Sequence, residues 1–140
     1  MTRALVSASL FLLPAGAVAA AADPAEKQEQ PKEAKAEVPK LSVEEFDAKR
    51  KAPDTVVVDV RTPQEFEAGH VPGAVNIDIA DKDFDKKVGA LDKKKTYIVH
   101  CARGRRSAQA SERMKSKVDK LFDFTGGMTA WEKAGKPVEK

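Results

Sequence analysis

Cysteine is scarce in this sequence, where Cys101 is the only one among 140 residues. A chain with one cysteine cannot form an intrachain disulfide, and it has no second thiol to resolve one, which weighs against thioredoxin-like redox chemistry. The chain also has no large excess of either charge. Its 25 lysines and arginines are intermixed with 22 aspartates and glutamates, and its net charge is +3. This mixture argues against nucleic-acid binding, which uses basic side chains gathered on one face.

A long apolar run occurs only at the N-terminus. Arg3 precedes an almost entirely apolar stretch, which Pro14 and Gly16 interrupt before the small-residue run AVAAAA. Spanning a membrane takes about 20 consecutive apolar residues, and this stretch reaches that length only by counting alanines. The layout predicts that residues 1–22 are a secretory signal peptide rather than a membrane anchor. We therefore expect an exported, periplasmic protein with no stable membrane insertion after cleavage.

The remainder of the chain divides into a linker and one domain. Residues 23–40 contain no aromatic residue and are dense in Glu, Lys, Gln and Pro, which predicts a disordered, charged linker. Residues 41–140 have the length of one compact domain, which buries about two thirds of its unfolded surface without help from a metal or a disulfide. Nothing in the sequence indicates oligomerisation, so we expect a monomer.

Short apolar runs alternate with helical patterns along this domain. Strands are predicted at residues 55–60, 75–79, 95–100 and 121–124, from their β-branched and aromatic content. Capping boxes predict helices that start after Ser42 and Thr62, and further helices are predicted at 81–91, at 107–117 and after Gly126. This alternation predicts an α/β domain with a mainly parallel sheet and helices on both faces.

Cys101 directly follows one of the predicted strands, and a predicted helix follows the next few residues. Sites in parallel sheets lie at the carboxyl ends of strands, and a helix N-terminus with basic neighbours lowers the pKa of a cysteine. Gly104 permits the backbone angles that turn successive N–H groups inward. Three chemistries fit such a loop: phosphoryl transfer through a cysteinyl phosphate, redox exchange, and sulfur transfer through a persulfide.

Three sequence motifs resemble those of the rhodaneses. CARGRR, from Cys101 to Arg106, resembles their Cys-x-x-Gly-x-Arg loop, and the stretches DVRTPQEFEAGHVPGAVNI (59–77) and GGMTAW (126–131) resemble two further motifs of the family. A related phosphatase loop is one residue longer, with its arginine at the position that Ser107 occupies here. The resemblance therefore favours a sulfurtransferase over a phosphatase.

The resemblance implies a rhodanese-like fold of about five strands and a two-step exchange without a metal or an organic cofactor. Cys101 would take a sulfur atom from a small anionic donor such as thiosulfate and pass it to cyanide or a thiol. The active-site loop would bind the substrate through Ala102, Arg103, Gly104, Arg105 and Arg106. A non-catalytic persulfide carrier is the alternative, and a Cys-dependent phosphatase is a weaker third.

Several polar residues are expected to support the site rather than to react. We expect Arg61 and Glu65 to form an ion pair that fixes the start of a helix. Asp59 is placed at the carboxyl end of its strand, where it is expected to brace the active-site loop. Strand alternation predicts that the side chain of His100 lies on the opposite face of the sheet from that of Cys101.

Overall fold

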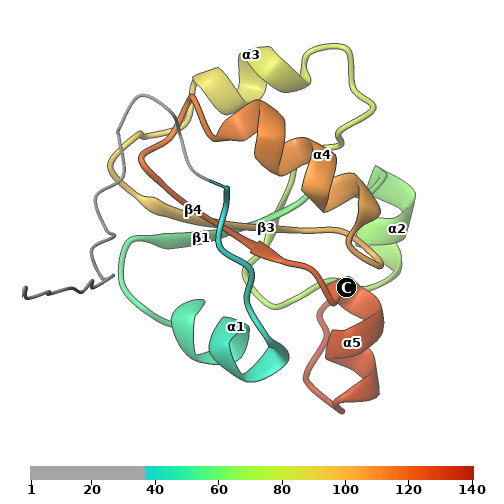
Figure 1. Ribbon diagram of the computed structural model, residues 1–140. Coiled ribbons are helices and arrows are strands. Elements are labelled where there is room, and N and C mark those ends of the chain that lie inside the picture. Colours follow the sequence, from blue (N-terminus) through green and yellow to red (C-terminus); the bar gives the residue numbers. More distant parts are fainter. Residues whose placement is uncertain (1–36) are drawn as a thin grey trace, which may run out of the picture. The chain divides into compact units, whose positions relative to one another are not determined.

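The structure is a computed structural model that describes residues 37–140 (Figure 1). The predicted signal peptide, residues 1–22, and the first part of the predicted linker, residues 23–36, lie outside the described residues. Among the residues described, no helix has the length and apolar composition needed to cross a bilayer.

A four-stranded sheet forms the centre of the domain, and every pair of neighbouring strands is parallel. The strand order is β2-β1-β3-β4, with bounds β1 (Thr55–Asp59), β2 (Val75–Asn76), β3 (Thr96–His100) and β4 (Lys120–Phe124). In register, Asp59 lies opposite His100 and His100 lies opposite Phe124, so these strands end at one edge. The prediction of a mainly parallel sheet is confirmed, and Cys101 follows β3 at this edge.

The chain before the first helix lies along the outer edge of β4. Lys40 forms a parallel bridge with Asp123, and the N–H of Leu41 donates to the carbonyl of Asp123 at 2.9 Å. Val38 is buried and packs in the core. Residues 38–40, which the sequence assigns to the linker, therefore pack against the domain. Their single bridge is not a full strand, so the predicted count of about five strands is approximate.

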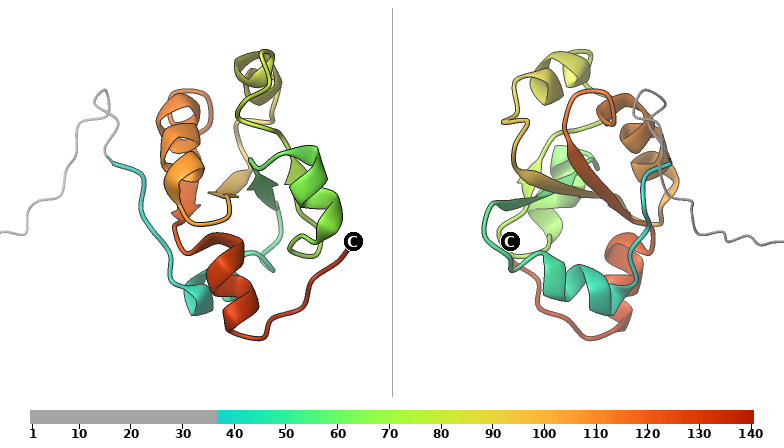
Figure 2. Two further views of the ribbon diagram at one scale, coloured as in Figure 1. Left: turned by 90° about the vertical axis from the view of Figure 1, so that its right-hand side faces the viewer. Right: turned by 60° about the vertical axis from the view of Figure 1, so that its left-hand side comes forward.

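Helices cover both faces of the sheet, as predicted. In Figures 1 and 2, α3 and α4 lie over one face, and α1 and α5 lie over the other. The short helix α2 lies between β1 and β2 in the sequence. The bounds are α1 (Val43–Lys49), α2 (Pro63–Ala68), α3 (Phe84–Gly89), α4 (Arg105–Met114) and α5 (Gly127–Lys133).

The core is divided by the alternation of side chains along the strands. Val99 of β3 packs in one cluster with Phe84 of α3 and Met114 of α4. Its neighbour Ile98 packs in the other cluster with Phe46 of α1 and with α5. This division explains why the centres of β1 (56–58) and β3 (97–99) are apolar at consecutive positions, since parallel strands covered on both faces bury side chains on both.

The element bounds differ from the predicted ones most clearly at β2 and α3, which are both shorter, while α4 starts two residues earlier and ends three residues earlier than predicted. Strand β2 ends at Asn76, where the side-chain amide donates to the carbonyls of Asp59 and Arg61. Beyond it, the N–H groups of Ile77 and Ile79 still donate to backbone carbonyls at the end of β1, but outside the regular strand ladder. Helix α3 starts at Phe84 rather than residue 81, because Asp81 instead accepts the N–H of the residue two positions ahead. Such local side-chain bonds compete with helix formation.

Candidate active site

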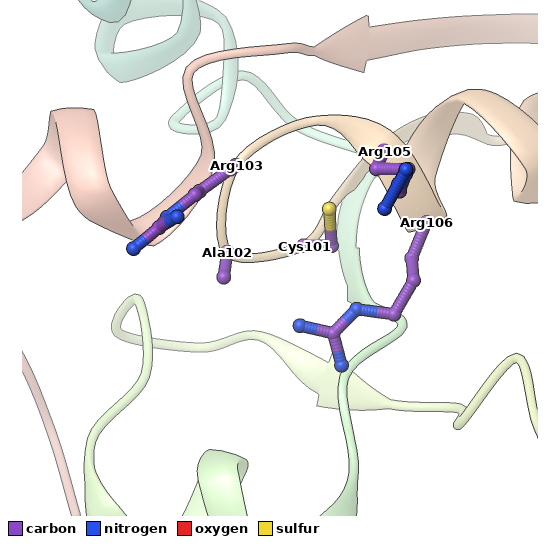
Figure 3. Close-up of a pocket in the computed structure, with 5 residues that line it drawn as sticks. All are labelled: Cys101, Ala102, Arg103, Arg105 and Arg106. Atoms are coloured by element: carbon purple, nitrogen blue, oxygen red, sulfur yellow. The ribbon is translucent and has the colours of Figure 1, made fainter.

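A pocket of about 370 Å³ opens at the carboxyl edge of the sheet. It is lined by five residues of the predicted active-site loop: Cys101, Ala102, Arg103, Arg105 and Arg106 (Figure 3). The sixth loop residue, Gly104, forms the bend between strand β3 and helix α4. Cys101 is only 1% exposed, so its sulfur is accessible to small groups that enter the pocket and not to a flat protein surface.

Two backbone N–H groups donate to the sulfur of Cys101. The N–H of Gly104 lies 3.1 Å from Sγ, and the N–H of Ser107 lies 3.3 Å from it. Ser107 is in the first turn of α4, where N–H groups have no partner within the helix and the helix dipole is positive. N–H groups fixed in this way are suited to stabilise negative charge that a reaction places on this sulfur.

Ser107 is a functional residue that the sequence analysis missed. The predicted cradle ends at Arg106, whereas the structure adds the next N–H group and fixes its position. The Ser107 hydroxyl donates to the Asp123 carboxylate at 2.8 Å, and burial raises the pKa of Asp123. The signal available in the sequence was the position of Ser107 in the first turn of the predicted helix, one residue beyond the motif.

The loop fits closely against the segment that joins β4 to α5. Gly104 has a φ of +99°, and a Cβ added there would lie 2.5 Å from the carbonyl oxygen of Thr125. Gly127 has a φ of +62°, and a Cβ there would lie 2.4 Å from the carbonyl oxygen of Cys101. Only glycine satisfies both the backbone angle and the space at these two positions.

The first turn of α5 holds the loop from behind. The N–H of Met128 donates to the carbonyl of Cys101 at 2.9 Å, and the N–H of Thr129 donates to the carbonyl of Ala102 at 3.0 Å. In a trans peptide the N–H points away from the C=O of the same unit. The N–H groups of Ala102 and Arg103 are therefore turned away from α5, which gives the GGMTAW stretch a role in orienting the cradle.

The side chain of His100 lies on the opposite face of the sheet from that of Cys101, as the strand alternation predicts, and it contacts the active-site loop from there. Its side chain is fully buried, with Nδ1 3.1 Å from the carbonyl oxygen of Cys101. Because a carbonyl only accepts, Nδ1 carries the proton and donates to it. Burial lowers the pKa of His100, which favours the neutral ring. Within the described residues Nε2 has no hydrogen-bond partner, and Oδ2 of Asp59 lies 3.8 Å from it.

The predicted ion pair between Arg61 and Glu65 is wrong. Arg61 instead binds Asp59, with Nε at 2.9 Å from Oδ1 and Nη2 at 2.7 Å from Oδ2, and it also donates to the carbonyl of Gly69 at 2.8 Å. Arg61 lies in the bend between β1 and α2, so its side chain reaches back to the strand end. Asp59 thus fixes Arg61, and Arg61 in turn binds the residue that ends α2. The Asp59 carboxylate forms its hydrogen bonds with Arg61 and not with the active-site loop.

The partner of Glu65 is Arg106, the closing residue of the loop. Nη1 of Arg106 donates to Oε1 at 2.8 Å, and Nη2 donates to Oε2 at 3.2 Å. The hydrogen bond from Arg106, together with those from Thr62, lowers the pKa of Glu65 to about 2. The pair links α2 to α4 across 41 residues of sequence, a separation at which the sequence gives no pairing signal.

Comparison with known proteins agrees with this geometry. Residues 42–134 match the family described as the rhodanese-like domain. The chain belongs to this family. Its match to a solved structure, a rhodanese-related protein from Thermoplasma volcanium, has a TM-score of 0.65 and 32% sequence identity, and it covers 72% of this chain and 97% of the other.

Curated relatives of this rhodanese-like chain include named sulfurtransferases. It is 33% identical over 89 residues to thiosulfate sulfurtransferase GlpE of Pseudoalteromonas translucida, covering 58% of this chain and 76% of that protein. It is 35% identical over 99 residues to adenylyltransferase and sulfurtransferase MOCS3 of Drosophila sechellia, covering 66% of this chain. The chain spans only 22% of the length of MOCS3, so this likeness concerns one part of a larger protein.

The arginines of this rhodanese-like domain are not equivalent. Arg103 and Arg105 are exposed, and within residues 37–140 neither forms an ion pair. Figure 3 shows Arg103 extending away from Cys101 on one side of the loop, with Arg105 and Arg106 on the other. In the part of the chain that the structure describes, no group of three or more His, Cys, Asp or Glu side chains is placed to hold a metal ion.

Proposed function

We propose that this rhodanese-like domain is a sulfurtransferase in which Cys101 carries the transferred sulfur as a persulfide. The observation that carries the proposal is the position of Sγ, which accepts two backbone N–H groups in an arginine-lined pocket. Donors fixed in place before the reaction stabilise negative charge without reorganisation. The named sulfurtransferases among its relatives support the same reaction class.

The reaction consists of two displacements at sulfur. The Cys101 thiolate attacks the outer sulfur of a donor such as thiosulfate, the S–S bond of the donor breaks, and sulfite leaves with the bonding electron pair. A persulfide anion then remains on Cys101. In the second step the carbon of cyanide, or the sulfur of a thiolate, attacks the terminal sulfur, and the Cys101 thiolate leaves. No net oxidant or reductant is consumed when cyanide is the acceptor.

The pocket supports a small, anionic donor. Its volume of about 370 Å³ and the 1% exposure of Cys101 restrict the group that reaches the sulfur to a small one. Arg105 and Arg103 line the pocket together with Cys101 (Figure 3), and a guanidinium group suits an oxyanion such as the sulfonate end of thiosulfate. We therefore assign attraction of the donor to Arg103 and Arg105.

A non-catalytic persulfide carrier is a second candidate, because one relative points to it. A Bacillus subtilis protein named as a candidate sulfur carrier, YrkF, is 30% identical over 96 residues, covering 67% of this chain and 51% of that protein. The same loop would serve both functions. A carrier would accept sulfur from a partner protein and would not turn over thiosulfate.

Turnover with thiosulfate and cyanide tests the enzyme proposal. We expect the protein to form thiocyanate catalytically, and we expect Cys101→Ser to form none while keeping the fold, because Ser is close to Cys in size. Thiocyanate formation by the folded variant would overturn the role of Cys101. No turnover by the native protein, together with sulfur loading from a persulfide-bearing partner, would establish the carrier instead.

We further propose that the chain is exported to the periplasm and works there as a monomer. The support is the signal-like composition of residues 1–22. N-terminal sequencing of the protein from the periplasmic fraction is expected to begin between residues 20 and 23. Recovery of the protein in the cytoplasmic fraction with residues 1–22 intact would contradict export.

A further inference from the structure

The closing arginine of the active-site loop already binds a carboxylate. Both terminal nitrogens of Arg106 donate to the two oxygens of Glu65, at 2.8 and 3.2 Å. A guanidinium group recognises a carboxylate or a phosphate with this same fork of N–H groups. The N–H groups that face Glu65 are therefore unavailable to a second anion while the ion pair is intact.

Glu65 is itself held in place for this contact. Its Oε1 accepts the backbone N–H of Thr62 at 3.1 Å and the Thr62 hydroxyl at 3.0 Å. The pKa of Glu65 is lowered to about 2, so the side chain is a carboxylate at neutral pH. The fixed carboxylate of Glu65 therefore competes with any anion in the pocket for the N–H groups of Arg106.

The ion pair lies at the pocket and not elsewhere on the surface. Arg106 lines the pocket together with Cys101, and both are drawn in Figure 3. Three arginines line this pocket, but Glu65 compensates the charge of one of them. The charge that an anion meets is therefore that of Arg103 and Arg105, both on the exposed rim.

We propose that Glu65 is a specificity-determining residue, which withholds Arg106 from anions in the pocket and so selects against phosphate-type oxyanions beside Cys101. The proposal rests on the proposed function in one respect. A sulfur donor needs only its outer sulfur next to Sγ, whereas a phosphate group bound there has to place several oxygens against donors. Withholding the N–H groups of Arg106 therefore weakens the binding of phosphate more than it hinders the approach of a donor's outer sulfur to Sγ.

Protection of Cys101 from alkylation measures anion binding directly. Inorganic phosphate is titrated against a fixed dose of iodoacetamide, and the alkylated fraction is read by intact mass. We expect Glu65→Gln to be half-protected at about tenfold less phosphate than the native protein, since it releases a charged, bidentate donor. Gln still accepts the Thr62 N–H, because the capping box tolerates Gln at this position, so the variant is expected to fold.

Two further variants separate the proposal from a general charge effect. Glu67→Gln changes the charge by the same amount on the same helix, at an exposed position, and it is expected to follow the native protein. In the double variant Glu65→Gln/Arg106→Gln, we expect the stronger protection of Cys101 by phosphate to be lost. Equal protection of Glu65→Gln and Glu67→Gln, or a gain that survives in the double variant, would overturn the proposal.

This readout does not depend on sulfur transfer. If the native protein fails to turn over thiosulfate, the protection assay still reports whether Glu65 masks Arg106. Conversely, unchanged protection in Glu65→Gln removes the specificity role while leaving persulfide chemistry at Cys101 untouched. The two proposals therefore fail separately.

Discussion

Cys101 and its neighbours act as much through their backbone as through their side chains. The sulfur accepts N–H groups from Gly104 and Ser107, while the carbonyl of Cys101 accepts from His100 and Met128. None of these bonds requires a reactive side chain at the donor position, apart from the imidazole of His100. The chemistry of the residue thus depends on how the surrounding peptide groups are turned.

At the rim of the pocket, Arg103→Ala and Arg105→Ala are expected to raise the KM for thiosulfate with little change in kcat. Each substitution removes attraction for the donor and leaves the reacting atoms in place. We expect the KM to rise by about three- to tenfold for each substitution. Steady-state kinetics measure both constants.

The matched control is Arg113→Ala, at the far end of α4, where the side chain pairs with Asp85. It removes the same charge from the same helix and is expected to leave the KM within twofold of native. A fall in kcat at unchanged KM for Arg105→Ala would contradict the attraction role.

Among the elements, α5 supports the active-site loop through its first turn, and this contact requires Gly127. Gly127→Ala is expected to lower the free energy of unfolding by more than about 2 kcal/mol, because it adds both a positive-φ strain and a contact with the Cys101 carbonyl. The loop would be displaced with it, so activity should fall as well. Chemical denaturation measures the stability change.

Gly135→Ala separates the two causes. Gly135 has a φ of +74° but no atom within 4 Å of an added Cβ, so only the backbone strain of about 1 kcal/mol applies there. A Gly127→Ala variant no less stable than Gly135→Ala would show that the loop and α5 are not closely packed.

The link between α2 and α4 makes the domain sensitive to acid. The folded pKa of Glu65, about 2, lies below its ordinary value of 4.5, so the ionised form stabilises the fold above about pH 4.5 and this contribution is lost as the pH falls toward 2. The difference in Tm between the native protein and Glu65→Gln is expected to be largest near neutral pH and to shrink in acid. A difference that stays constant across this range would contradict the ion pair.

For the whole molecule, the sequence is sufficient to predict the layers and the reactive loop. The runs TVVVDV and KTYIVH predict β1 and β3 because their β-branched, aromatic and apolar residues suit buried strands. Both capping boxes form as predicted, after Ser42 and Thr62. These features are local, so their signals lie within a few residues of the structure that they produce.

Contacts between distant segments could not be predicted in the same way. Arg61 and Glu65 are close in sequence and opposite in charge, yet each pairs elsewhere, because Arg61 precedes α2 and Glu65 faces a loop 41 residues away. The contact of Gly127 with the Cys101 carbonyl depends on how β3 and β4 are placed side by side. Register and packing decide such contacts, and a single sequence does not encode them locally.

The most direct test of the central claim is the intact mass of the protein after thiosulfate and then after cyanide. Because Cys101 is the only thiol, a persulfide can form at one position. We expect a gain of one sulfur atom with thiosulfate, its complete removal by cyanide, and no gain in Cys101→Ser. A native protein whose mass is unchanged by thiosulfate, or a Cys101→Ser variant that gains sulfur, would contradict it.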